Sequence, residues 1–162
     1  MIDEKDVLYI FTSELRKRLQ SSGMTYRELA FKARCVPSRV QMYLRGNNFP
    51  NLWTLVLMAE SLGCCVDDLL GYKRYTASNL LHTDSPFERF TNEFDFALYF
   101  KECLRNQMLK QNADQEKLAE FTGISERLIY QYLSPGYPMP HVAQVLTICS
   151  ALDCTPSDLL GY

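Results

Sequence analysis

Apolar residues recur at helical spacing along this chain. Near its start, Phe11, Leu15 and Leu19 follow one another at intervals of four, with small polar and charged residues between them. That spacing places the three side chains on one stripe of an amphipathic helix. No segment alternates apolar and polar residues with a period of two, which is the pattern of a half-buried strand. The sequence therefore predicts an all-α protein.

Breaks in the apolar pattern divide residues 1–75 into five predicted helices. The first ends at Ser21-Ser22-Gly23, and the second follows Thr25, which forms a capping-box pattern with Glu28 and leads into a helix that ends near Ala33. Pro37 suits the first turn of a third helix, because the N–H that proline lacks has no partner there. The remaining helix limits are about Arg45 for the third, Leu52 to Leu62 for the fourth and Val66 to Leu70 for the fifth.

The second half of the chain repeats the first. The segment Asp68 to Tyr72 recurs letter for letter as Asp158 to Tyr162, an offset of 90. One additional loop residue shifts the register, and upstream of it the offset is 89, which pairs Tyr43-Leu44 with Tyr132-Leu133. Two copies of one residue pattern, about 90 positions apart, favour two small domains over a single one. We expect the domains at residues 1–75 and 93–162, joined by a linker at residues 76–92.

Local helix signals are clearer in the second copy. Asp114 and Ser125 are suitable N-cap residues, and Gly123 suits a left-handed turn. The first helix of this copy is longer and more apolar than its counterpart, so we expect it to pack against a further surface. The linker is also too apolar for a free tether, and part of it is expected to lie on a domain or to form a helical turn near residues 86–90. Its apolar residues are Leu80, Leu81, Phe87 and Phe90.

The net charge of −2 hides a difference between the halves. Residues 1–75 hold eleven Lys or Arg and eight Asp or Glu, a balance of +3, whereas residues 76–162 hold six and eleven, a balance of −5. Balances of opposite sign imply that the two copies need not share one role. Domains of this size bury only about 60% of their unfolded surface, so docking between the copies or homodimerisation is expected to add stability.

Other features exclude several classes of function. The cysteines form no Cys-x-x-Cys pair, no signal peptide is recognised, and no apolar run reaches the ~18 residues of a membrane span. We expect a cytoplasmic protein whose cysteines pack as small apolar side chains. His82 and His141 have no recurring carboxylate or thiol partner, and no Gly-rich phosphate loop or metal-ligand spacing occurs. The sequence therefore predicts no enzyme, no metal and no cofactor.

Two short predicted helices joined by a tight turn, inside a five-helix unit, form a helix-turn-helix pattern. The residues from Thr25 to Ala30, together with Cys35, Ser38, Val40, Arg45-Gly46, Pro50 and Leu62-Gly63, resemble the phage-repressor and Cro type, also called the XRE family. The second copy, from Gln115 to Ala119 and from Gly123 to Tyr130, is the closer match. The resemblance implies two tandem lambda-repressor-like domains of five helices each, and double-stranded DNA as the partner.

A helix that protrudes from the surface of a compact domain can enter the major groove and present side chains to the base edges. Arg127 can bond a guanine edge and Gln131 an adenine edge, each giving about 1–3 kcal/mol of discrimination. From periodicity, we expect Leu128 and Tyr130 to face outward as well. The resemblance implies base contacts from Pro37, Ser38 and Met42 in the first copy and from Glu126, Arg127 and Gln131 in the second.

Phosphate contacts are expected from cationic and amide side chains and from the N-termini of the second and third helices. The first copy departs from the family where Arg34 replaces the usual turn glycine and Val36 replaces a capping hydroxyl. The second copy departs where Ser134-Pro135-Gly136 replaces Arg45-Gly46 and so removes a cation. The expected backbone-contacting residues are Thr25, Tyr26, Arg34, Arg39, Gln41, Arg45, Gln115, Ser125 and Tyr130.

These patterns predict a sequence-specific DNA-binding transcriptional regulator, a repressor or an activator that acts by occupying a promoter. The two predicted recognition helices differ in sequence, which favours an asymmetric target. No small-molecule effector is evident from the sequence. The alternative is an interaction protein, of the antitoxin or antirepressor kind, in which the acidic second copy dimerises or binds another regulator.

Overall fold

The computed structural model describes residues 3–72 and 89–160, and all regular structure in these ranges is helical. The all-α prediction is confirmed for these residues. Most of the expected linker, including Leu80, Leu81 and Phe87, lies outside the described residues. His82 also lies outside them.

Five helices form the first half of the chain, close to the limits predicted from its apolar breaks. Asp3 caps the first helix, which ends at Gly23 with a left-handed φ of 67°. Pro37 occupies the first turn of the third helix, and Asn51 caps the fourth through a bond to the Thr54 N–H. The helices are α1 (Glu4–Ser22), α2 (Tyr26–Lys32), α3 (Pro37–Leu44), α4 (Leu52–Ser61) and α5 (Val66–Leu70).

The second half has five described helices in the same order and of similar lengths. Asp114 and Ser125 cap the second and third of them, as expected from the sequence. His141 is the N-cap residue of the fourth. The helices are α7 (Glu93–Lys110), α8 (Gln115–Thr122), α9 (Glu126–Leu133), α10 (Val142–Ala151) and α11 (Pro156–Leu160).

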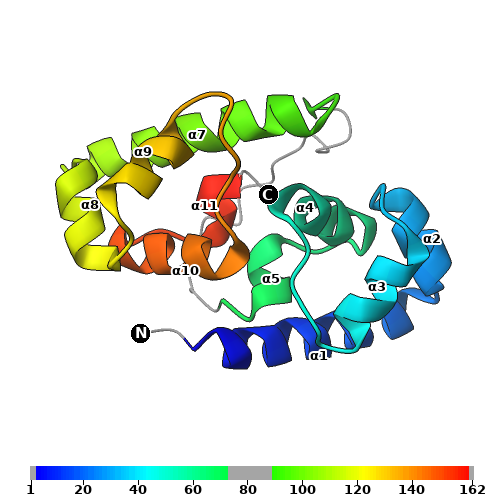
Figure 1. Ribbon diagram of the computed structural model, residues 1–162. Coiled ribbons are helices and arrows are strands. Elements are labelled where there is room, and N and C mark those ends of the chain that lie inside the picture. Colours follow the sequence, from blue (N-terminus) through cyan, green and yellow to red (C-terminus); the bar gives the residue numbers. More distant parts are fainter. Residues whose placement is uncertain (1–2, 73–88, 161–162) are drawn as a thin grey trace.

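The two sets of helices lie around a common centre (Figure 1). In that view α1 runs along the lower edge and α7 along the upper edge, with α2 and α3 at one side and α8 and α9 at the other. The short helices α5 and α11 pack against each other between them. The two helix-turn-helix elements therefore lie on opposite sides of the molecule.

Polar and aromatic contacts join the halves at this centre. The Ser157 N–H donates to Asp67 Oδ1 at 2.9 Å, and the Tyr72 hydroxyl donates to the Cys154 carbonyl at 3.2 Å. Asp67 and Ser157 occupy equivalent positions at the offset of 90, so α5 meets its own counterpart as it would across an approximate twofold axis. We call this contact between α5 and α11 the seam.

The start of α7 adds an aromatic contact to the seam. The Trp53 ring of α4 lies 5.2 Å from the Phe96 ring, measured between centroids, and Phe90 lies 5.6 Å from Phe96. All three side chains are buried. The expectation that the first helix of the second copy packs against a further surface is therefore confirmed. The expectation that it is longer than its counterpart is wrong, because α7 has 18 residues and α1 has 19. Burial of a large aromatic side chain typically contributes about 1.5–3 kcal/mol, so this cluster stabilises the contact between the halves.

Candidate nucleic-acid interface

The first helix-turn-helix is built by α2, a tight turn and α3. Thr25 and Glu28 form the predicted capping box: the Thr25 N–H donates to the Glu28 carboxylate at 2.7 Å, and the Glu28 N–H donates to the Thr25 hydroxyl at 3.2 Å. These bonds to Thr25 hold the pKa of Glu28 below its ordinary value. Arg34 adopts a left-handed φ of 53°, the conformation that favours glycine. Val36 caps α3 without a side-chain bond.

The second helix-turn-helix, α8 to α9, has stronger local signals. Gly123 takes the left-handed turn with φ 71°, and its N–H donates to the Ala119 carbonyl at 2.8 Å. Asp114 accepts from the Lys117 N–H at 2.9 Å, and Ser125 accepts from the Leu128 N–H at 3.4 Å. Each N-cap residue satisfies an N–H that the helix itself leaves unpaired.

The residues expected at the bases line the outward faces of α3 and α9. Pro37 and Ser38 are exposed, and Met42 is 41% exposed. In α9, Glu126 and Arg127 are exposed and Gln131 is half-buried. Between these positions, Val40, Tyr43, Ile129 and Tyr132 are buried and hold both helices on the core.

One expected outward position is wrong. Leu128 is half-buried and packs against the core rather than facing solvent. It lies only one residue before the buried Ile129, so the apolar face of α9 is wider than a strict period would give. Tyr130 on the opposite side of the helix is 56% exposed, as expected.

The expected phosphate-contacting residues differ in how accessible they are. Thr25, Arg39, Arg45 and Ser125 are exposed, whereas Tyr26, Gln41 and Gln115 are half-buried. Arg34 is engaged within the chain, because its Nη1 donates to the Thr91 carbonyl at 3.3 Å. That bond links the first helix-turn-helix to the segment that leads into α7.

A comparison with known families finds a match to part of the second half. Residues 103–162 match the Cro/C1-type helix-turn-helix DNA-binding domain. The match begins within α7 and includes α8, α9 and α10, so both helices of the second helix-turn-helix belong to it. The match indicates a DNA-binding regulator. No curated protein and no solved structure was matched by the chain.

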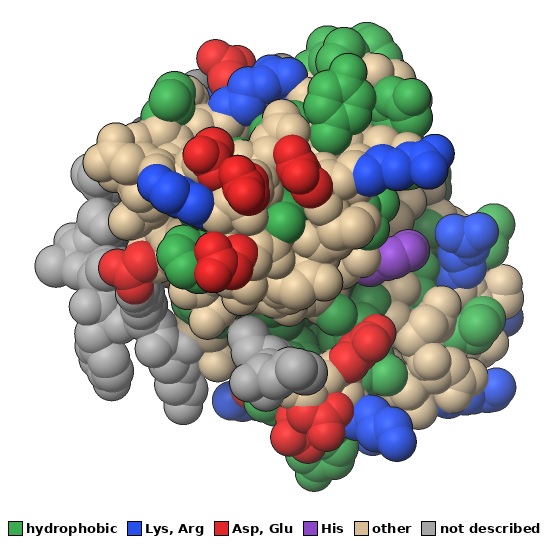
Figure 2. All heavy atoms as spheres, turned by 60° about the vertical axis from the view of Figure 1, so that its left-hand side comes forward, with side chains coloured by type: hydrophobic (Ala, Val, Ile, Leu, Met, Phe, Trp, Pro, Cys, Tyr) green, Lys and Arg blue, Asp and Glu red, His purple; other side chains and the backbone are tan. Residues whose placement is uncertain are grey.

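The surface of α8 and α9 that is expected to meet DNA is mixed in charge. A groove of about 720 Å³ lies where α7 ends and α8 and α9 begin. Its walls carry the acidic residues Asp114, Glu116 and Glu126 beside the apolar Leu109 and Tyr130. Figure 2 turns the α8 side forward and shows acidic side chains spread across that face, with Lys and Arg side chains at separate points among them. The DNA contact that the sequence predicts for this face would therefore depend on individual cations such as Arg127 rather than on a broad basic surface.

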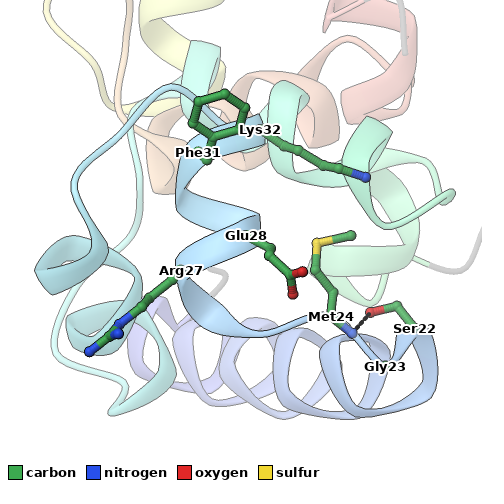
Figure 3. A pocket seen from close by; sticks show the side chains of 7 residues that line it. All are labelled: Ser22, Gly23, Met24, Arg27, Glu28, Phe31 and Lys32. Atoms are coloured by element: carbon green, nitrogen blue, oxygen red, sulfur yellow. Dashed lines mark hydrogen bonds between the residues drawn. The ribbon is translucent and has the colours of Figure 1, made fainter.

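The first half has a hollow of about 500 Å³ beside α2 (Figure 3). Glu28 and Met24 point toward its centre, whereas Arg27 points away. Phe31 on its edge is 86% exposed. No residue of α3 lines this hollow, so it lies outside the expected base-reading surface.

Sequence reasoning missed the side chains that anchor the ends of α3 and α9. The Thr12 hydroxyl donates to the Tyr43 carbonyl at 3.3 Å, and Arg16 Nε donates to the Leu44 carbonyl at 2.7 Å. At the equivalent positions, Lys101 donates to the Tyr132 carbonyl at 3.2 Å, and Arg105 donates to the Leu133 carbonyl. The offset of 89 could have signalled that these pairs share a role.

The described residues offer neither a metal-binding cluster nor a membrane-spanning helix. Within residues 3–72 and 89–160, no cluster of three or more His, Cys, Asp or Glu side chains could hold a metal ion. The described helices include none long and apolar enough to cross a membrane. The cysteines in the same ranges are free thiols, and Cys64 and Cys154 are buried as expected.

Proposed function

We propose that this protein is a sequence-specific DNA-binding transcriptional regulator in which two helix-turn-helix modules, residues 1–75 and 93–162, engage one duplex. The family match over residues 103–162 carries the proposal for the second module. The exposed Arg127 and Tyr130 and the half-buried Gln131 supply the chemistry for reading bases and contacting phosphates.

The proposal for the first module rests on its likeness to the second. Both have helices of the same order, a capped start to the helix-turn-helix, a residue with positive φ in the turn, and paired anchors from the long helix to the recognition helix. Residues 1–75 also carry the net positive charge that attracts a phosphate backbone. Arg39 and Arg45 are exposed at the two ends of α3.

A target for both modules has two unlike half-sites. In α3 the proposed base-facing side chains are Pro37, Ser38 and Met42, whereas in α9 they are Glu126, Arg127 and Gln131. Because the seam joins the halves, the two recognition helices belong to one body, and the spacing between half-sites is set by that body. Binding occupies the promoter and excludes or recruits RNA polymerase.

Selection of bound duplexes from a random pool tests the proposal. The expected product is a site with two different half-sites at a fixed spacing. Arg127→Ala and Gln131→Ala relax selection in one half-site only, and Ser38→Ala with Met42→Ala relaxes it in the other. Lys110→Ala, an exposed cation on α7, is the control and leaves the selected sequence unchanged. A perfect palindrome would instead mean that a homodimer uses one module per chain.

The salt dependence of binding gives an independent measurement. The logarithm of the binding constant is expected to fall linearly with the logarithm of the salt concentration, with a slope of about 0.9 for each phosphate neutralised. Arg39→Ala and Arg45→Ala each reduce that slope. A binding constant that does not change with salt would contradict DNA as the partner.

One observation favours a second candidate function, a protein-interaction role for residues 93–162. The groove of about 720 Å³ at the start of α8 and α9 is lined by three carboxylates, apolar side chains and one cation, Arg105, which donates to the Leu133 carbonyl. The excess of negative charge suits a basic partner segment better than a phosphate backbone. Under this alternative, Arg39→Ala weakens DNA binding and Arg127→Ala has no effect on it.

A further inference from the structure

A cavity of about 560 Å³ lies at the junction of the two halves, away from the recognition surfaces. The start of α7 forms one wall, the loop of residues 136–141 forms another, and Asn51 and Leu52 at the start of α4 border a third side. The cavity is open to solvent, since Phe94 is 59% and Tyr137 46% exposed. Its volume is within the range of about 300–1,000 Å³ that is usual for small-molecule sites. Most of its lining is apolar or aromatic, including Phe94, Leu98 and Tyr137.

The cavity also contains a buried cation. Lys101 lines it and is only 2% exposed. Its ammonium donates to the carbonyls of Tyr132 at 3.2 Å and Tyr137 at 3.0 Å, which uses two of its three N–H groups. Among the described residues, no carboxylate forms an ion pair with it. A buried charge normally has a partner of opposite charge, and this ammonium has one N–H group that none of the hydrogen bonds to Tyr132 and Tyr137 uses.

The first half shows that the structural role of Lys101 does not require a charge. Thr12 occupies the equivalent position and donates to the Tyr43 carbonyl at 3.3 Å, as Lys101 does to the Tyr132 carbonyl. A neutral hydroxyl is therefore sufficient to hold the end of a recognition helix in this fold. The positive charge and the longer side chain of Lys101 are an addition specific to the second half.

A second departure from the repeat meets Lys101 at the same cavity. The loop after the recognition helix spans seven residues, 134–140, in the second half and six residues, 45–50, in the first. The longer loop contributes the Tyr137 carbonyl that accepts from Lys101, and its residues 136–140 line the cavity. The two differences between the copies thus combine to make one pocket that contains a cation.

We propose that this cavity binds a small organic anion, a carboxylate with an apolar or aromatic body. The Lys101 ammonium would bond the carboxylate, while Phe94, Leu98 and Tyr137 would contact the body. Glu93 lies at the cavity's edge, but it is exposed and its carboxylate accepts from the Asn51 amide at 3.5 Å, so solvent screens its charge. Burial lowers the pKa of the Lys101 ammonium, and the nearby Arg105 charge lowers it further, which is consistent with a cation that lacks a counter-ion.

Such a ligand would act on the recognition helix directly. The Tyr132 carbonyl that Lys101 holds belongs to the last turn of α9, so an anion that draws the ammonium toward itself changes how that helix is anchored. This effect on DNA binding rests on the proposed function. Occupancy of the cavity does not, and the following experiment contains no DNA, so its failure is distinguishable from a failure of the DNA-binding proposal.

Titrations of the full chain can be followed through Trp53, its single tryptophan. Trp53 follows Leu52, which lines the cavity. Its ring packs on Phe96, which lies in the sequence between the cavity-lining residues Phe94 and Ala97. The probes are phenylacetate, cyclohexanecarboxylate and hexanoate, each compared with its primary amide of nearly the same shape. At least one acid is expected to bind at least ten times more tightly than its amide, with saturable changes in Trp53 emission.

Substitutions assign the charge preference to Lys101. Lys101→Thr copies the first half and is expected to remove the difference between acid and amide. Lys110→Thr removes the same charge from an exposed position on the same helix and keeps the difference. If Lys101→Thr does not fold, NMR of the Lys101 side chain in the unaltered chain replaces it, and the bound acid is expected to raise the pKa of the ammonium. Equal affinity for acids and amides, or a Lys101 resonance that no acid shifts, would overturn the proposal.

Discussion

At the scale of single residues, the position shared by Thr12 and Lys101 shows how a repeat diverges. Both side chains satisfy the carbonyl of the equivalent tyrosine, so the backbone requirement is the same in both halves. The lysine fulfils it at the cost of a desolvated charge, which a threonine avoids. Because lysine at this position is unfavourable for folding alone, we attribute its presence to the anion binding proposed for the cavity.

The first prediction concerns the pH dependence of stability. Burial lowers the pKa of Lys101 from its ordinary 10.5 in the folded chain, so the unfolded chain binds more protons between the two values. The penalty for the buried charge is therefore complete below the folded-state pKa and disappears as the pH approaches 10.5. Relative to Lys101→Thr, the unaltered protein should gain unfolding free energy over this window, measured by urea denaturation at several pH values.

Lys110→Thr is the control for that series, because Lys110 is exposed on the same helix. It measures how the unfolding free energy responds when the same charge is removed from an exposed position. A pH dependence no larger for Lys101→Thr than for this control would show that the buried ammonium carries no penalty.

A further residue-scale prediction concerns the thiols. Burial raises the pKa of Cys64 to about 12, and burial also raises the pKa of Cys149. Because the thiolate is the reactive form, both should resist alkylation by iodoacetamide near neutral pH in the folded chain. Mass spectrometry after brief labelling should find Cys64 and Cys149 modified only when a denaturant is present. Equal labelling with and without denaturant would contradict this prediction.

Among the elements, the turn after α2 and the turn after α8 both contain a residue with positive φ, but the residue differs. Gly123 adopts its left-handed conformation without strain, whereas Arg34 adopts the same conformation with a side chain. Arg34 also donates to the Thr91 carbonyl, a contact between the halves that a glycine could not make. The first turn thus combines a less favourable backbone with a tertiary hydrogen bond.

Gly123→Ala measures the backbone contribution by itself. A Cβ at this position has no other atom within 4 Å, so the substitution introduces strain without a steric clash. The expected loss of unfolding free energy is about 1–2 kcal/mol. Ser150→Ala, at an exposed site in α10, serves as the control and should change stability by less than about 0.5 kcal/mol. A loss no larger for Gly123→Ala than for this control would contradict the strain.

In the molecule as a whole, the seam between α5 and α11 joins the helices of the first half, α1 to α5, to those of the second, α7 to α11. A domain of this size buries only about 60% of the surface that its unfolded chain exposes, and the buried residues of the two sets form one continuous core. The hydrogen bond from the Ser157 N–H to Asp67 and the packing of Trp53 on Phe96 supply contacts that neither set has alone. Unfolding of the two sets should therefore be coupled.

Substitution of Asp67 tests that coupling. Asp67→Ala leaves the Ser157 N–H without its acceptor and is expected to cost about 1–3 kcal/mol of unfolding free energy. Asp67→Asn retains an oxygen acceptor and should cost less. Calorimetry should show a single transition in the unaltered chain and a broader or divided one in Asp67→Ala. Identical curves for all three proteins would show that the seam does not couple the halves.

The helical fold, the recurring residue pattern and the helix-turn-helix pattern can all be predicted from the sequence. These depend on local signals: apolar spacing, the capping pair Thr25 and Glu28, the turn glycine Gly123, and Pro37 in a first turn. Each acts within a few residues of its own position, so a reader of the sequence can recognise it. The outward faces of α3 and α9 followed from the same spacing, with Leu128 as the exception.

The contacts between the two halves, and the cavity that lies between them, could not be predicted from the sequence and are seen only in the folded chain. Lys101 lies 36 positions from the Tyr137 carbonyl it holds, Arg34 lies 57 from Thr91, and Asp67 lies 90 from Ser157. No local pattern encodes such partners, because they depend on the packing of helices that are distant in sequence. The cavity around Lys101 and the seam that joins the recognition helices into one body arise from those long-range contacts.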